Sequence, residues 1–159
     1  MGKLNKPIEN VAVKRWLFKN PVEPENNEIT LLGDDLYSRQ TICELALEKG
    51  YNLIFVAKPS SHQSLYEWLD FSEKNGEMRI GAIKKYEKGK RRIYRYRYVN
   101  NVPIRESEPS LMVNWYEIEI FDDAKNKVIY KNSFITNHEL NEQNIFKMIV
   151  SGRTRWKVE

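Results

Sequence analysis

The spacing of apolar residues in the first part of the chain predicts helices that alternate with short buried strands. Apolar side chains recur at helical spacing over Ile8–Phe18, and Asn20 followed by Pro21 ends that helix. Two continuous apolar runs, Ile29–Gly33 and Tyr51–Ala57, have the length and composition of strands that are buried on both faces. This order is typical of a parallel sheet covered by helices.

A helix is predicted after each of these two strands. Ser38 is the expected N-cap of the first, which runs to Lys49. Ser60 or Ser61 is the expected N-cap of the second, which closes at Gly76.

After Gly76 the pattern changes to the alternation of antiparallel strands. Met78–Tyr86 and Lys90–Val99 form a predicted hairpin, and Val113–Phe121 and Val128–Ile135 form a second one. The two hairpins predict an antiparallel block of about sixty residues between the alternating helices and strands and the end of the chain.

The chain ends in residues with helical spacing. A helix around Ile145 is capped either by Thr136, which has capping-box spacing to Glu139, or by Asn141. Ser151-Gly152 is expected to break this helix, and Arg153–Glu159 is expected to begin another.

Length and composition indicate the number of domains and the cellular compartment. A chain of 159 residues with 41% hydrophobic and 30% charged residues predicts one globular domain. It has no apolar run near the ~20 residues that span a bilayer, and residues 1–10 lack the apolar core of a signal peptide. Cys43 is the only cysteine, and we expect it to be buried in a protein of the reducing cytoplasm.

Positive charge is concentrated in the first hairpin. The net charge is only +4, but residues 79–99 hold nine Lys or Arg against the single acid Glu87. Alternation puts Arg95 and Arg97 on one face and Tyr94, Tyr96 and Tyr98 on the other. Two interpretations stay open, a nucleic-acid surface and a solvated face opposite a tyrosine core.

Two sets of residues are candidates for chemistry. Asp34 and Asp35 directly follow a buried strand, at the rim where parallel sheets keep their sites, although Gly-Asp-Asp is also an ordinary turn. Arg155 and Glu159 are four residues apart and share a helix face, which is also the spacing of a surface ion pair.

Taken in order, the segments GDDLYS, FVAKP, HQSLYEWL, TNHE and GRTRWKVE resemble the DDE transposases of bacterial cut-and-paste insertion sequences. The resemblance extends over essentially the whole chain. It implies an α/β fold with a partial ribonuclease H-like parallel sheet, interrupted by an antiparallel β insertion. The implied division is a core of residues 1–76, an insertion of 77–136 and returning core helices of 137–159.

The resemblance also implies a catalytic site. Asp34 matches the second catalytic Asp, with Asp35 as the fallback, and Glu159 matches the catalytic Glu, preceded by Arg155 at the family spacing. Gly152 stands where the family pattern has a Tyr, which puts one phosphate contact in doubt. In the family, carboxylates hold two divalent ions, so Mg²⁺ is expected at Asp34 and Glu159, with Mn²⁺ as a substitute.

The implied partner is the double-stranded DNA of transposon ends, with a nucleoid-associated, cytoplasmic location. In the family the β insertion helps to hold that DNA. The expected DNA-binding residues are Lys58, Lys84, Lys85, Lys90, Arg92, Arg95 and Arg97. A second copy of the chain or a full-length transposase is the expected protein partner.

No acid lies on a predicted strand before Ile29, where the family has its first catalytic Asp. We therefore expect an incomplete interior piece of a transposase that does not cleave DNA alone. Two alternatives stay open. The first is a non-catalytic DNA-binding fragment that inhibits or regulates a full-length transposase, and the second is a decayed reading frame without function.

Overall fold

The computed structural model describes residues 2–23 and 29–158, and it describes side chains within 11–23 and 29–154. This part of the chain forms helices and strands in the order α1 (Gly2–Lys19), β1 (Thr30–Gly33), the 3₁₀ turn η2 (Asp35–Tyr37), α2 (Gln40–Glu48), β2 (Asn52–Val56), α3 (Gln63–Lys74), β3 (Arg79–Glu87), β4 (Lys90–Pro103), β5 (Met112–Asp122), β6 (Lys127–Thr136) and α4 (Ile145–Val158).

The strands form one mixed sheet in the order β1-β2-β6-β5-β4-β3. Only β1 and β2 are parallel, and every other neighbouring pair is antiparallel. β6 joins β2 through the pairs Ile54 with Thr136 and Val56 with Phe134. The fold is therefore mixed α/β, and the hairpins predicted as an insertion extend the same sheet.

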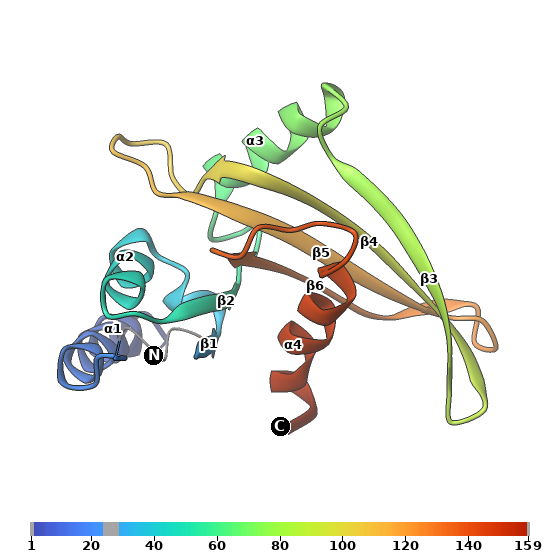
Figure 1. Cartoon of the computed structure of the whole chain (residues 1–159), viewed down its shortest axis with the longest axis horizontal. Helices are drawn as coiled ribbons and strands as arrows, with labels where there is room; N and C mark the ends of the chain where they lie inside the picture. The colour runs from blue at the N-terminus through green and yellow to red at the C-terminus, as the bar shows by residue number, and fades with distance from the viewer. Residues whose placement is uncertain (1, 24–28, 159) are drawn as a thin grey trace.

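The two faces of the sheet carry separate cores. We call one the three-helix face, where α1, α2 and α3 cover side chains such as Leu53, Phe55 and Trp115. We call the other the α4 face, where α4 covers side chains such as Ile54 and Tyr116. Figure 1 shows α3 and α4 on opposite sides of the sheet, with α1 and α2 stacked beside β1 and β2.

The expected burial of Cys43 is confirmed, since it lies within the core of the three-helix face. Burial raises the pKa of its thiol to about 12, so the side chain stays protonated at neutral pH. No helix in the described ranges has the length and apolar character needed to cross a membrane.

The hairpins reach beyond the helices that cover the sheet (Figure 1). The first turns at Lys88 (φ 53°) and Gly89 (φ 77°), the left-handed pair that tight hairpins require. The strand predicted to end at Val99 is longer than expected, because β4 continues to Pro103. The register shifts between Val99 and Val102, so a bulge carries the strand through this polar stretch.

The predicted N-caps of α2 and α3 are wrong. α2 begins at Gln40 and α3 at Gln63, and neither helix has a side-chain cap. The serine hydroxyls have other partners, because Ser38 donates to the backbone oxygen of Asp35 and Ser61 donates to the Asp35 carboxylate.

The predicted buried face of α1 is also wrong within its described side chains. Leu17 is fully buried, whereas Val11 and Trp16 are about half exposed. The helix ends as expected, since Lys19 is its last residue. The oxygen of Asn20 then accepts a hydrogen bond from Tyr51, which turns the end of α1 towards the sheet.

α4 does not break at Ser151-Gly152, and it runs unbroken from Ile145 to Val158. Of the two predicted caps, Asn141 is the one used, because its side-chain oxygen accepts from the Asn144 N–H at 2.9 Å. The Asn141 N–H in turn donates to the side-chain oxygen of Asn144, so the pair forms a reciprocal box.

Gly152 lies inside α4 because no larger residue fits there. A Cβ at this position would lie 2.9 Å from the Phe134 ring and 2.9 Å from the Tyr116 hydroxyl oxygen. The glycine lets the helix approach the sheet closely, and this contact outweighs its low helix propensity.

We expect Gly152→Val to lower the free energy of unfolding by about 1–3 kcal/mol, since it overpacks the contact with Phe134 and Tyr116. Thr154→Val is the control, because this exposed position lies one half-turn further along the same helix. Urea unfolding of both variants measures the difference, and equal stability would contradict the packing argument.

Candidate functional site

Asp34 lies at the carboxyl end of β1 on the α4 face of the sheet. Along β1, Leu31 and Gly33 face the three helices. Thr30 and Leu32 face the other way and line a groove beside α4. The backbone of Asp34 is still extended (φ −72°, ψ 168°), so alternation directs its half-buried side chain to the α4 face as well.

The groove between the sheet edge and α4 has a volume of about 610 Å³. Its floor is formed by β1 and β2 and includes Leu32 and Ile54, and its wall is formed by α4 and includes Met148, Ser151 and Thr154. Both sides of the groove mix apolar with polar side chains, since Thr30 and Asn52 also line the floor and Lys147 also lines the wall.

The last turns of α4 lie at the same end of the sheet as Asp34. Gly152 packs on Phe134, which pairs with Val56, the final residue of β2. On the neighbouring strand Gly33 pairs with Phe55, so Asp34 is level with Val56. The helix therefore extends towards the rim that carries Asp34.

Asp35 has a structural role in the loops that follow the two parallel strands. Its carboxylate accepts a hydrogen bond from the Lys58 N–H at 2.7 Å and another from the Ser61 hydroxyl. Both oxygens are thus used to join the end of β1 to the end of β2. Asp34 and Asp35 consequently have different surroundings, although they are adjacent in the sequence.

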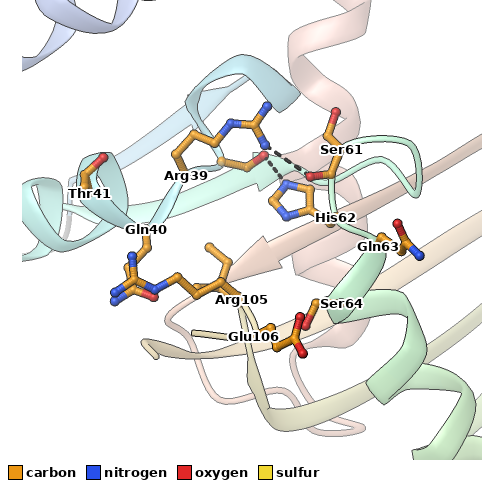
Figure 2. A pocket seen from close by; sticks show the side chains of 11 residues that line it. Arg39, Gln40, Thr41, Ser61, His62, Gln63, Ser64, Arg105 and Glu106 are labelled. Atoms are coloured by element: carbon orange, nitrogen blue, oxygen red, sulfur yellow. Dashed lines mark hydrogen bonds between the residues drawn. The ribbon is translucent and has the colours of Figure 1, made fainter. Parts of the chain in front are cut away.

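Ser38, His62 and Asp35 form a buried cluster, shown in part in Figure 2. The Ser38 hydroxyl lies 2.7 Å from His62 Nε2, and the same Nε2 lies 3.6 Å from the Asp35 carboxylate. A serine hydrolase requires the base to use its two nitrogens for the two partners, so this cluster is not a catalytic triad. Burial lowers the pKa of His62, while Asp35 raises it and Arg39 lowers it further. The ring is neutral at pH 7.

The side chains of the other two predicted catalytic residues are outside the described part of the structure. Arg155 lies in the helix, but its side chain and the whole of Glu159 lie outside the described residues. Within the described part, no three His, Cys, Asp or Glu side chains are arranged to hold a metal ion. Asp34 alone is not a metal site, so we derive no chemical step through Mg²⁺.

Lys58 lies on the rim with the two aspartates, as expected. Its backbone N–H binds Asp35, and its side chain is exposed. The amine is therefore accessible to an anion that approaches the carboxyl ends of β1 and β2.

The three predicted DNA-binding arginines pair with acids on the neighbouring strand. Arg97 pairs with Glu117 at 2.9 Å and with Glu73 at 3.1 Å. Burial lowers the pKa of Arg97, but Glu117 and Glu73 outweigh it and raise the pKa overall. The sequence count missed these partners because they lie outside residues 79–99, Glu73 in α3 and Glu117 in β5.

The other two arginines also pair with acids. Arg95 pairs with Glu119 at 3.3 Å. Arg92 lies 3.3 Å from the fully buried Asp122 and 3.3 Å from Glu87. A hydrogen bond from the Lys125 N–H lowers the pKa of Asp122, burial opposes this, and Arg92 lowers the pKa further. Asp122 therefore stays ionised beside the arginine.

The predicted lysines of the hairpin lie on both faces of the sheet. Lys84 is opposite Ile93 on the face of Arg95, whereas Lys85 lies on the α4 face with its amine 4.2 Å from the Phe146 ring centre. Lys90 is exposed and borders a hollow of about 790 Å³ near the turn. The side chains around this hollow are Glu87, Lys88, Lys90, Arg92 and Arg153.

Arg153 is the residue that sequence reasoning missed. It extends from α4 to the Tyr94 hydroxyl at 2.8 Å and lies 3.9 Å from Glu87, so it connects α4 to the first hairpin. Arg153 directly follows Gly152, and the predicted helix break at Ser151-Gly152 assigned it to a separate helix.

A scan against models of known protein families gives no match for this chain, and no curated protein matches it significantly.

We expect Asp35→Ala to lower the free energy of unfolding by about 1–3 kcal/mol, because the substitution leaves the Lys58 N–H and the Ser61 hydroxyl without their acceptor. Asp70→Ala, at an exposed position of α3, is the control and should change stability by about 0.5 kcal/mol or less. Chemical denaturation measures both variants. Equal stability of the two would show that Asp35 does not hold the loops together.

Proposed function

We propose that this chain forms part of the catalytic core of a DDE transposase, which cuts and transfers DNA strands. The observation that carries the proposal is the position of Asp34. It ends a strand at the sheet rim, on the face that α4 covers, and the last turns of α4 are at the same end of the sheet. This arrangement supports the proposal because acids that share metal ions must converge, and α4 leads in sequence to Glu159.

The contrast between the two adjacent aspartates favours Asp34 over Asp35 as the catalytic residue. The carboxylate of Asp35 is fully engaged with Lys58 and Ser61, whereas alternation directs Asp34 towards the groove beside α4. In this proposal Asp34 binds the ion, Glu159 completes the pair and Arg155 contacts a DNA phosphate.

A second candidate is a DNA-binding role without catalysis, in which the chain regulates a complete transposase. The cationic hollow at the hairpin turn favours it, because Lys88, Lys90, Arg92 and Arg153 meet there with the single acid Glu87. The DNA contact in this proposal comes chiefly from Lys88 and Lys90 at the turn, since Arg92, Arg95 and Arg97 are paired with acids.

Mn²⁺ titration followed by NMR tests the catalytic proposal. Mn²⁺ broadens amide signals near its binding site even when the binding is weak. We expect signals around Asp34 and in the last turn of α4 to broaden together, and Asp34→Asn to abolish the effect.

Asp70→Asn is the control, because it also removes a single carboxylate, but at an exposed position of α3, on the three-helix side of the sheet. It should leave the broadening unchanged. Broadening around Asp34 alone, or broadening that persists in Asp34→Asn, would reject the shared metal site.

DNA binding across a salt series tests the role of the hollow. We expect Lys88→Gln/Lys90→Gln to weaken duplex binding and to reduce the salt slope by about two, one for each lost phosphate contact. Lys19→Gln/Lys74→Gln removes the same charge at the ends of two helices and should have a smaller effect. Equal effects of the two double variants would mean that only net charge matters.

A further inference from the structure

Two helices begin at one pocket on the three-helix side of the sheet rim. The pocket has a volume of about 310 Å³ and is formed by the first residues of α2, the first residues of α3 and residues 104–106 between β4 and β5. Figure 2 shows Gln40 and Thr41 on one side and Gln63 and Ser64 on the other. It lies on the face of the sheet opposite to the groove beside α4.

The polar groups at the starts of these helices are not satisfied by side chains of the described residues. Ser38 and Ser61, which precede the helices, instead bind Asp35. Neither α2 nor α3 has a side-chain cap, so the first turns that border the pocket have N–H groups without such an acceptor. Two converging helix N-termini attract an anion.

His62 is an independent indication of a ligand. The residue is 6% exposed and its ring lies in the wall of the pocket (Figure 2). Ser38 donates its proton to the backbone oxygen of Asp35, so it accepts from the His62 Nε2–H. Nδ1 therefore carries a lone pair, and no described residue donates a hydrogen bond to it.

Arg39 supplies the positive charge of the pocket. One of its guanidinium nitrogens donates to the Ser61 oxygen at 3.2 Å, which holds the side chain against the start of α3. The guanidinium has five N–H donors in all, so donors remain for a ligand. Arg105 also borders the pocket, but its donors bind the oxygens of Ser107 and Pro109 in its own loop.

We propose that this pocket binds a phosphate group, held by Arg39 and the first turns of α2 and α3, with one proton shared between His62 Nδ1 and a phosphate oxygen. The ligand is free phosphate or a phosphate at the end of a nucleic-acid strand. The inference is drawn from the pocket itself and does not depend on the proposed transposase activity.

The shared proton makes the affinity of the pocket for phosphate depend on pH. Asp35, Arg39, Arg105 and Glu106 are the charged groups around His62. Because the bound phosphate favours a proton at Nδ1, binding retains or takes up a proton, and affinity falls as the pH rises from about 6 to about 8. Sulfate has no proton to share, so it should bind more weakly than phosphate at the higher pH.

Titration of the full chain with inorganic phosphate, followed by ¹⁵N NMR of the His62 ring, tests the proposal. We expect a saturable shift of the Nδ1 signal. Arg39→Gln should weaken phosphate binding by about tenfold, as expected for the loss of a charge-assisted hydrogen bond. Arg15→Gln, at an exposed position of α1, is the control and should leave the affinity unchanged.

Three results would overturn the proposal. They are no shift of the His62 signal in the wild-type chain, equal affinity of Arg39→Gln and the wild type, and sulfate binding as tight as phosphate at about pH 8. The first and third need no variant, so they stand even if Arg39→Gln fails to fold. An oligonucleotide with and without a 5′-phosphate then separates the two sources of the ligand.

Discussion

The pairing of β6 with β2 is the constraint on which the rest of the structure depends. It connects the parallel strands β1 and β2 to the antiparallel hairpins through only three pairs of residues. Because the pairing is antiparallel and in register, Phe134 continues the α4 face beside Val56, and Ile135 continues the three-helix face beside Phe55. Both cores therefore extend across the junction, and α4 can cover strands from both parts of the chain.

This arrangement explains which features could be predicted from the sequence. The spacing of apolar residues along the chain predicts the helices and strands, because this spacing reflects which faces of each element are buried and can be seen within one segment. The joining of the two parts into one sheet was not visible, because the register between Ile54 and Thr136 depends on residues about eighty positions apart. The helical Gly152 was misread for the same reason, as its partners Phe134 and Tyr116 belong to other strands.

The candidate sites show the same limit. Asp34 was identified from its place after an apolar strand, but its difference from Asp35 follows from the loop after β2, where Lys58 and Ser61 engage only one of the two. The hydrogen bonds of Ser38 and Ser61 to Asp35 explain the wrong caps, because a serine that binds Asp35 is not available to a helix N-terminus. The charge of the first hairpin was estimated from residues of that segment alone. The electrostatic surface also depends on the acids of neighbouring strands, which offset the charge of the arginines.

Asp35 also relates the two sides of the sheet rim to each other. It follows Asp34, whose side chain faces the α4 groove, and it holds Ser38, Ser61 and His62 in place on the side of the three helices. Because the serines bind Asp35, the N-termini of α2 and α3 have no side-chain cap. Because Asp35 joins the end of β1 to the loop after β2, Asp34 keeps its extended backbone. Through its carboxylate and its backbone oxygen, Asp35 thus affects both the backbone that orients Asp34 and the polarity of the pocket on the opposite face.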